Sequence, residues 1–533
     1  MSGRLLRYIS LILCLALFSG CLSGCSGLDG HAGTDTSTSS GQTPNGTQSG
    51  EQPVSASEGD KLFTLNYDEN AGFNPYSCEN GDNITVSGLM YEGLFKLSPN
   101  FEAENVLCAD SETTDGINYT FKLKSDIYFQ DGSILAAEDV AYSLNLAKSS
   151  ANYAKRLQNL LSVTATDNYT LTVTLKTKNY LLPALLDVPI VKNSTGKDDI
   201  PVGTGPYTFV NGKLQAFRQY RDYSFLPSDT VYLASCSASE LSEAFSAGLI
   251  DLIHADPCSS SYPDIPVDYE VRYYDTTILQ YIGFNMQNAV LADSEIRRAI
   301  SHAVDRPYIA DTLMSGHAKA APLVLSSALP YYDTAWESGT EYSMQTLSAI
   351  LAGRGVADDN GDSYLEYPID GVYTDFSINF IVNEENENKV EAAQTITDVL
   401  KNIGINITLT VLPWDDYIAA IDQGEYDMYY AEVRLSADFD LTDILSYGAS
   451  LAFGITEDSD GAVYVADFLG ASTETAETRM AKALCNYVYN TAPIIPVIYK
   501  EYAAITHRNI ISDMELSQTS VFYNFTEWKM NQG

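Results

Sequence analysis

Basic residues are scarce in this chain, and the shortage excludes several kinds of partner. Lys and Arg together number 30 against 70 Asp and Glu, which gives a formal charge of −40. A surface of this sign repels the phosphate backbone of a nucleic acid and an anionic lipid surface. We therefore expect no nucleic acid among the partners and interpret the charge mainly as that of a solvated surface.

Motifs of catalysis and metal binding are also missing. No G-x-S-x-G, H-E-x-x-H or G-x-x-x-x-G-K occurs, and the chain has only five His. Residues 358–362 begin like a calcium loop, but Ser363 and Ile369 stand where an EF-hand needs Gly and Glu, so we predict a solvated turn. His302 and His317 have no second ligand at metal-binding spacing, which favours surface or helix-cap roles. We expect no catalytic residue, no metal and no cofactor.

No apolar run near the N-terminus is long enough to span a bilayer. Tyr8–Phe18 is an apolar run of 11 residues, whereas about 20 are needed. Two Arg precede it, which is the pattern of an export signal, and we assign residues 1–25 to that signal. Leu-Ser-Gly before Cys25 resembles a bacterial lipobox, so Cys25 is predicted to be lipidated. Cys21 is the competing lipidation site. A third interpretation of residues 1–25 is an ordinary secretory signal whose cysteines are not lipidated.

Residues 26–57 have almost no large apolar side chain and are rich in Gly, Ser and Thr. Such a segment has nothing with which to build a core and is predicted to be a flexible linker. Its root-mean-square reach is roughly 30 Å. A lipid on Cys25 would therefore hold a folded body close to a membrane while leaving it free to rotate.

Cysteines beyond the signal are few and widely spaced. The odd number excludes a complete disulfide framework, and no C-x-x-C occurs among them. We expect buried free thiols, with one disulfide between Cys236 and Cys258 as the alternative. The five are Cys78, Cys108, Cys236, Cys258 and Cys485.

The chain does have length, apolar content and clear periodicity. Its 533 residues exceed the roughly 250 to 300 at which a single core stops growing, so we expect at least two lobes. Period-two alternation predicts a strand at 119–123, and a helical stripe follows from Glu138 to Ala147. Residues 162–175 read as a hairpin around Asp167-Asn168. Strand 376–382, helix 389–402 and strand 405–411 form a β-α-β crossover, which implies a parallel pair.

Several segments together resemble one family. Residues 119–148 read F-x-L-K, F-x-D-G-S and A-E-D-V-A-Y-S-L. Y-E-G-L-F stands at 91–95, G-T-G-P-Y at 203–207, R-A-I-x-x-A-x-D-R at 298–306, and W-x-x-Y followed by G-x-Y-D-M at 414–428. In this order they resemble the peptide/nickel (family 5) extracytoplasmic solute-binding proteins of ABC importers.

The resemblance implies an α/β, two-lobed periplasmic-binding-protein-like fold (type II, cluster C) with mixed sheets and hinge strands. Lobe I would comprise residues 58–281 plus 493–533, and lobe II residues 282–492. The implied protein is an extracytoplasmic, lipid-anchored, monomeric receptor that delivers an oligopeptide or dipeptide to an ABC permease and ATPase complex and is no enzyme. Alternatives on the same fold bind a nickel chelate, haem or oligosaccharide, or serve as a surface signalling receptor without transport.

The resemblance also implies a ligand site. Residues 437–439 match an A-D-aromatic triplet whose Asp pairs with the ligand's α-ammonium, so Asp438 and the neighbouring Phe439 are the leading candidates. Arg434 and Trp414 are further candidate ligand contacts. A solvated acid or turn former is the alternative reading of Asp438.

The sequence departs from the family pattern at three positions. Leu435 replaces the usual Trp, and Glu432 stands where a tripeptide binder offers Arg to the ligand carboxylate, which weakens tripeptide specificity in particular. Ala136 replaces the usual Thr or Ser at a helix N-cap, at a cost of about 1 kcal/mol.

Overall fold

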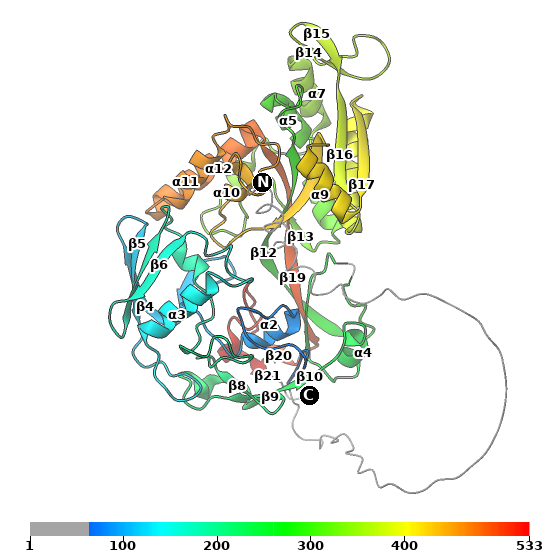
Figure 1. Cartoon of the computed structure of the whole chain (residues 1–533). Helices are drawn as coiled ribbons and strands as arrows, with labels where there is room; N and C mark the ends of the chain where they lie inside the picture. Colours follow the sequence, from blue (N-terminus) through cyan, green and yellow to red (C-terminus); the bar gives the residue numbers. More distant parts are fainter. Residues whose placement is uncertain (1–62, 260, 532–533) are drawn as a thin grey trace, which may run out of the picture.

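The computed structural model describes residues 63–259 and 261–531 (Figure 1). The predicted export signal, the linker and both candidate lipidation sites, Cys21 and Cys25, lie outside these residues. Within the described ranges, no helix has both the length and the apolar character needed to cross a bilayer.

Two long antiparallel strands, β12 (Tyr269–Phe284) and β19 (Ile494–His507), form the middle of the main sheet. The later part of β19 pairs with β11 (Leu252–Ala255), whereas the later part of β12 pairs with β18 (Met428–Arg434). Both strands therefore run from one half of the molecule into the other (Figure 1). Below, lobe I denotes residues 63–281 and 493–531, and lobe II denotes residues 282–492.

Lobe I completes its half of the sheet with short strands of both directions. Beyond β11 the order is β1-β10-β9-β8, in which β1 is parallel to its two neighbours and the other pairs are antiparallel. Two short helices pack nearby. These elements are β1 (Thr64–Asn66), β8 (Tyr207–Val210), β9 (Lys213–Ala216), β10 (Thr230–Ala234), α2 (Gly81–Ser87) and α4 (Leu241–Ser246).

A separate four-stranded sheet of lobe I contains the strand predicted at 119–123. Its order is β4-β5-β7-β6, and all its pairs are antiparallel. The alternation is confirmed, because Tyr119, Phe121 and Leu123 are buried on one face. The predicted hairpin is also confirmed. The elements are β4 (Cys108–Thr113), β5 (Asn118–Leu123), β6 (Leu160–Ala165), β7 (Thr170–Leu175) and α3 (Ala137–Ala147).

Helix α3 begins without a side-chain cap, as Ala136 predicts. The backbone N–H of Ala136 instead donates to Oδ2 of Asp139 at 2.9 Å. Ahead of β8, the G-T-G-P-Y segment is a close-packed turn and not a phosphate loop. A Cβ on Gly203 would lie 2.3 Å from the Met90 carbonyl oxygen, and one on Gly205 would lie 2.4 Å from the Met90 carbonyl carbon. Only glycine fits against that backbone.

Lobe II contains the predicted β-α-β crossover. β16 (Ser377–Asn383) and β17 (Asn406–Leu412) pair in parallel, joined by α8 (Glu387–Asn402). The helix begins two residues earlier than its apolar stripe because Asn386 accepts a capping hydrogen bond from Lys389 N–H. Helix α9 (Trp414–Gln423) follows and ends at Gly424, whose φ of 72° is left-handed.

Further elements of lobe II surround this sheet. A hairpin of β14 (Glu366–Ile369) and β15 (Val372–Asp375) projects at its far end, while α10, α11 and α12 lie beside the four-stranded sheet of lobe I (Figure 1). The helices are α5 (Ser294–Ser301), α6 (Arg306–Tyr308), α7 (Met344–Gly353), α10 (Thr442–Leu445), α11 (Gly461–Leu469) and α12 (Glu474–Thr491).

The hairpin of β2 (Phe95–Leu97) and β3 (Ala103–Asn105) extends from lobe I into the core of lobe II. Phe101, at its tip, is 4% exposed and belongs to the apolar cluster that also contains Phe439 and Tyr499. A smaller contact joins Leu97 and Ala184 of lobe I to Ala437 of lobe II. The two lobes thus share apolar packing in addition to the hinge strands.

The structure decides between the alternatives left open for the cysteines and for His302. The alternative disulfide does not form, because Cys236 and Cys258 are both free, and Cys236 is half-buried while the other four thiols are buried. Of the two roles expected for His302, it takes the C-cap of α5, and it is only 2% exposed and therefore not at the surface. His317 is half-buried between the rings of Tyr262 and Tyr273.

Candidate functional site

The loop of residues 435–441 leads from β18 to α10 and contains Asp438, which is 2% exposed. Oδ2 of Asp438 accepts a hydrogen bond of 2.8 Å from Nδ2 of Asn179, a residue of lobe I. Oδ1 accepts from the Ser436 hydroxyl and, at 3.4 Å, from the Asp440 N–H. The carboxylate therefore lies at the contact between the lobes, and groups of the protein itself occupy its oxygens.

Burial raises the pKa of the Asp438 carboxyl, and the hydrogen bonds from Ser436 and Asn179 offset only part of that effect. Burial also raises the pKa of Asp440, with the neighbouring Asp438 charge as the second cause, to about 6. The two neighbouring carboxyl groups beside lobe I thus both have raised pKa values.

Two basic side chains of lobe I interact with carboxylates of lobe II. The Asp438 charge acts on the guanidinium of Arg156, whose pKa is nevertheless lowered because burial is the larger effect. Arg156 pairs with Asp187 of its own lobe. Lys155 forms an ion pair of 3.4 Å with Asp443 of α10. Hydrogen bonds and charges therefore hold the four-stranded part of lobe I against the loop.

Phe439 is fully buried and adopts a positive φ of 52°. Its ring meets Phe101 edge-on at 5.2 Å between centroids and Tyr499 at 6.2 Å. Phe439 therefore anchors the loop between the Phe101 hairpin and the hinge strand β19. The sequence suggested the aromatic but gave no sign of Phe101, which is more than 300 positions away.

Arg434 and Trp414 make their contacts elsewhere. The Arg434 guanidinium lies 5.5 Å from the centroid of the Tyr502 ring and donates to the Tyr502 hydroxyl at 3.2 Å. Trp414 is half-buried and stacks on Tyr417 at 5.8 Å. The structure thus places each of them beside a tyrosine and records no bond from either to the Asp438 loop among the residues it describes.

Glu432 belongs to a buried charge cluster at the hinge. Its Oε2 accepts from Gln280 Nε2 at 2.8 Å and lies 3.9 Å from the Lys500 ammonium. Burial alone would raise the pKa of Glu432, but the charges of Lys500 and Lys389 outweigh it and lower that pKa. Lys500 also pairs with Asp256 of lobe I. The Glu that replaces the family's Arg is therefore neutralised inside the protein.

A cavity of about 640 Å³ opens beside the Asp438 loop. Lobe I contributes residues within 100–103 and 180–184, and lobe II contributes residues within 329–331 and 474–478 together with Ala437. This volume lies in the range of small-molecule sites, and a junction between lobes is a common place for them. The aromatic residues Phe101, Tyr180 and Tyr331 are among those that line it.

Three glutamates are the charged residues that line this cavity in the described chain: Glu102, Glu474 and Glu477. Burial first, and then the charges of Glu474 and Glu102, raise the pKa of Glu477 to about 7. The sequence did not predict these three glutamates as cavity residues. With 70 acidic residues in the chain, no sequence pattern distinguishes them from the others.

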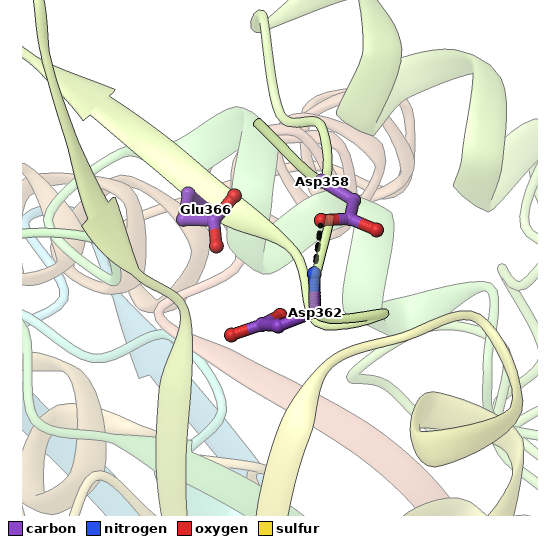
Figure 2. A group of neighbouring side chains, drawn as sticks. All are labelled: Asp358, Asp362 and Glu366. Carbon is purple, nitrogen blue, oxygen red and sulfur yellow. Dashed lines mark hydrogen bonds between the residues drawn. The ribbon is translucent and has the colours of Figure 1, made fainter. Parts of the chain in front are cut away.

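The acidic loop at 358–366 brings together Asp358, Asp362 and Glu366, with carboxylate oxygens within 4.8 Å of one another (Figure 2). The two Asp are exposed, as a solvated turn predicts, but Glu366 is only 4% exposed. Asp358 accepts the N–H of Asp362 at 3.1 Å, and Glu366 accepts the N–H of Asp359 at 2.7 Å. The loop's own donors thus account for the convergence of the three carboxylates.

Comparison with known proteins assigns the chain to a family. Residues 102–449, more than half of the sequence, match the model of bacterial extracellular solute-binding proteins, family 5, middle region. The chain belongs to family 5.

Its family 5 relatives include two curated proteins. The oligopeptide-binding protein AppA of Bacillus subtilis is 24% identical, over 79% of this chain and 79% of AppA. The glutathione-binding protein GsiB of Escherichia coli K12 is 23% identical, over 82% of this chain and 88% of GsiB. Among solved structures, HbpA2 of Haemophilus parasuis is 18% identical with a TM-score of 0.72, covering 89% of this chain and all of that one. The expected two-lobed binding-protein fold is confirmed.

Proposed function

We propose that this family 5 protein captures a peptide between its two lobes and delivers it to an ABC permease and ATPase complex without converting it chemically. The observation that carries the proposal is the cavity of about 640 Å³ that both lobes line beside Asp438. The peptide and glutathione relatives support this class of ligand.

Asp438 is proposed to receive the α-ammonium of the peptide. In the structure described here its Oδ2 accepts the neutral amide of Asn179 at 2.8 Å. A ligand ammonium would replace that neutral donor with a cationic one and so form an ion pair with the carboxylate. Phe439 holds the loop in place from behind, and Arg434 and Trp414 stay predicted contacts for the rest of the ligand.

Calorimetric titration of the purified protein with pools of short peptides tests this proposal. Asp438→Asn keeps the size of the side chain and removes its charge, so we expect at least about tenfold weaker binding. Asp416→Asn, an exposed carboxylate of α9, is the matched control and should bind as the wild type does. Equal affinity in Asp438→Asn would remove the role given to this carboxylate. Binding of haem, oligosaccharide or a nickel chelate in place of every peptide would refute the peptide proposal.

The anchoring proposal concerns Cys25, with residues 26–57 as the linker. One or two lipid chains on Cys25 would hold the receptor outside the cytoplasm beside its permease. Cys25→Ser should release the protein from the membrane fraction, whereas Cys21→Ser should not. The opposite result would indicate that Cys21 is the lipidated residue.

A further inference from the structure

The interlobe cavity has charge of one sign only. Glu474 and Glu477 come from the first turn of α12 in lobe II, and Glu102 comes from the β2–β3 hairpin of lobe I. No Lys, Arg or His is among the described residues that line it. The aromatic residues Phe101, Tyr180 and Tyr331 also line the cavity.

Acidic residues in a first helical turn are common because they interact favourably with the helix dipole. That explanation accounts for Glu474, which is exposed, but not for Glu477. Glu477 is half-buried, faces the charges of Glu474 and Glu102, and acts in turn on the Tyr331 hydroxyl. A helix end alone would lower the pKa of Glu477, and the cavity raises it. Among the described residues, the charged groups that act on Glu477 are thus carboxylates.

We propose that the cavity binds a cationic group of the ligand, an alkylammonium or a guanidinium, between Glu477 and Glu474 of lobe II and Glu102 of lobe I. The inference rests on the proposed function and names its ligand class: peptides with a Lys or Arg side chain near the amino end. Tyr180 and Tyr331 offer aromatic faces to the cation and its methylene groups.

The placement of the three acids couples this cation to closure of the lobes. Without a ligand, Glu102 repels Glu477 across the interface, which disfavours contact of the lobes. A cation between them turns that repulsion into attraction. The ligand therefore binds the closed arrangement better than the open one, which is the difference in affinity that a closure driven by ligand requires.

The test compares peptide pools that differ at one position, Lys against norleucine, by calorimetric titration of the full-length protein. We expect the Lys pool to bind about tenfold more tightly, in keeping with a charge-assisted contact. Glu477→Gln should abolish the preference. Glu138→Gln removes an exposed acid from the first turn of α3 in lobe I and should retain the preference in full.

A free diamine, 1,5-diaminopentane, distinguishes the source of the cation. If the diamine binds the wild type but not Glu477→Gln, and no peptide binds, the cationic site is supported and the peptide function is refuted. If Lys and norleucine peptides bind the wild type equally, the cationic site is refuted and the peptide function stands. Failure of every peptide and of the diamine refutes both.

The preference should also depend on pH. Glu477 has a pKa of about 7 in the ligand-free protein, so it is mostly neutral at about pH 6 and mostly ionised at about pH 8. The groups that act on it are Glu474 on its own helix, Glu102 on the hairpin and Tyr331 on the loop opposite. We expect the Lys preference to grow between these pH values in the wild type and to stay flat in Glu477→Gln. A preference that falls with rising pH contradicts the assignment.

Discussion

The hydrogen bond between Asn179 and Asp438 is the sharpest single test of how the lobes are held together. It joins two residues that are each 2% exposed, across 2.8 Å, at the contact of lobe I with the 435–441 loop. Asn179→Ala removes the donor and leaves a buried carboxylate with one partner fewer. Asp438→Ala removes the acceptor, and the double variant removes both partners at once.

A hydrogen bond to a charged group contributes about 1.5 to 3 kcal/mol. Asn179→Ala also removes an acceptor of the Leu181 N–H within lobe I, so the single variant overstates the interlobe bond. A double-mutant cycle subtracts that local loss. We expect a coupling energy of about 1.5 kcal/mol, equivalent to roughly a tenfold change in the opening equilibrium.

Hydrogen exchange at Tyr180 gives a direct assay, because its N–H donates to the Leu469 carbonyl of lobe II at 2.8 Å. That amide exchanges when the lobes separate locally, so its protection reports the opening free energy. Exchange should be about tenfold faster in Asn179→Ala at pH 8. Asn159→Ala, whose hydrogen bonds stay within lobe I, should leave it unchanged. A coupling energy indistinguishable from zero would refute the interlobe role of this bond.

Three further outcomes are expected in thermal melts. Phe101→Ala should cost about 3 to 5 kcal/mol because its ring fills the core of lobe II, whereas Phe225→Ala, at a ring 66% exposed, should cost almost nothing; equal losses would contradict the insertion. The pKa of Glu477 rises from 4.5 to about 7, so ionisation of this side chain destabilises the folded protein as pH rises through that range. After discounting for solvent screening, Glu477→Gln should stabilise the protein by about 1 kcal/mol at pH 8 and should have no such effect below pH 4. A gain in stability at both pH values would exclude ionisation of Glu477 as its cause. Gly205→Ala should lower the melting temperature by several degrees, because its Cβ would meet Met90 backbone at 2.4 Å, and a neutral result would show that the turn can shift.

Elements with local periodicity were predictable from the sequence. The alternation at 119–123, the hairpin at 162–175 and each element of the crossover between β16 and β17 can be predicted from residues that are close together in the sequence. Their boundaries moved by one or two residues, in one case because a side chain outside the apolar pattern decided the end. Asn386 is such a case, since it caps α8 two residues ahead of the stripe.

The site was only partly predictable, because its partners are far apart in the chain. The resemblance identified the Asp438 triplet, yet nothing near Asp438 indicates that Asn179, 259 residues away, donates to it. Phe101 carries no pattern that distinguishes an interlobe anchor from an ordinary hairpin residue. The cavity glutamates could not be identified from the sequence, because acidic residues are common throughout it and outnumber basic ones by more than two to one. Contacts between lobes therefore had to come from the structure.

Native mass spectrometry of the purified protein tests the central claim most directly. The protein would be offered pools of short peptides, oligosaccharides, haem and Ni²⁺ in competition. Capture of a peptide between the lobes predicts a peptide adduct on the wild type that is weakened in Asp438→Asn and retained in Asp416→Asn. An adduct with sugar, haem or metal and none with peptide would contradict the account.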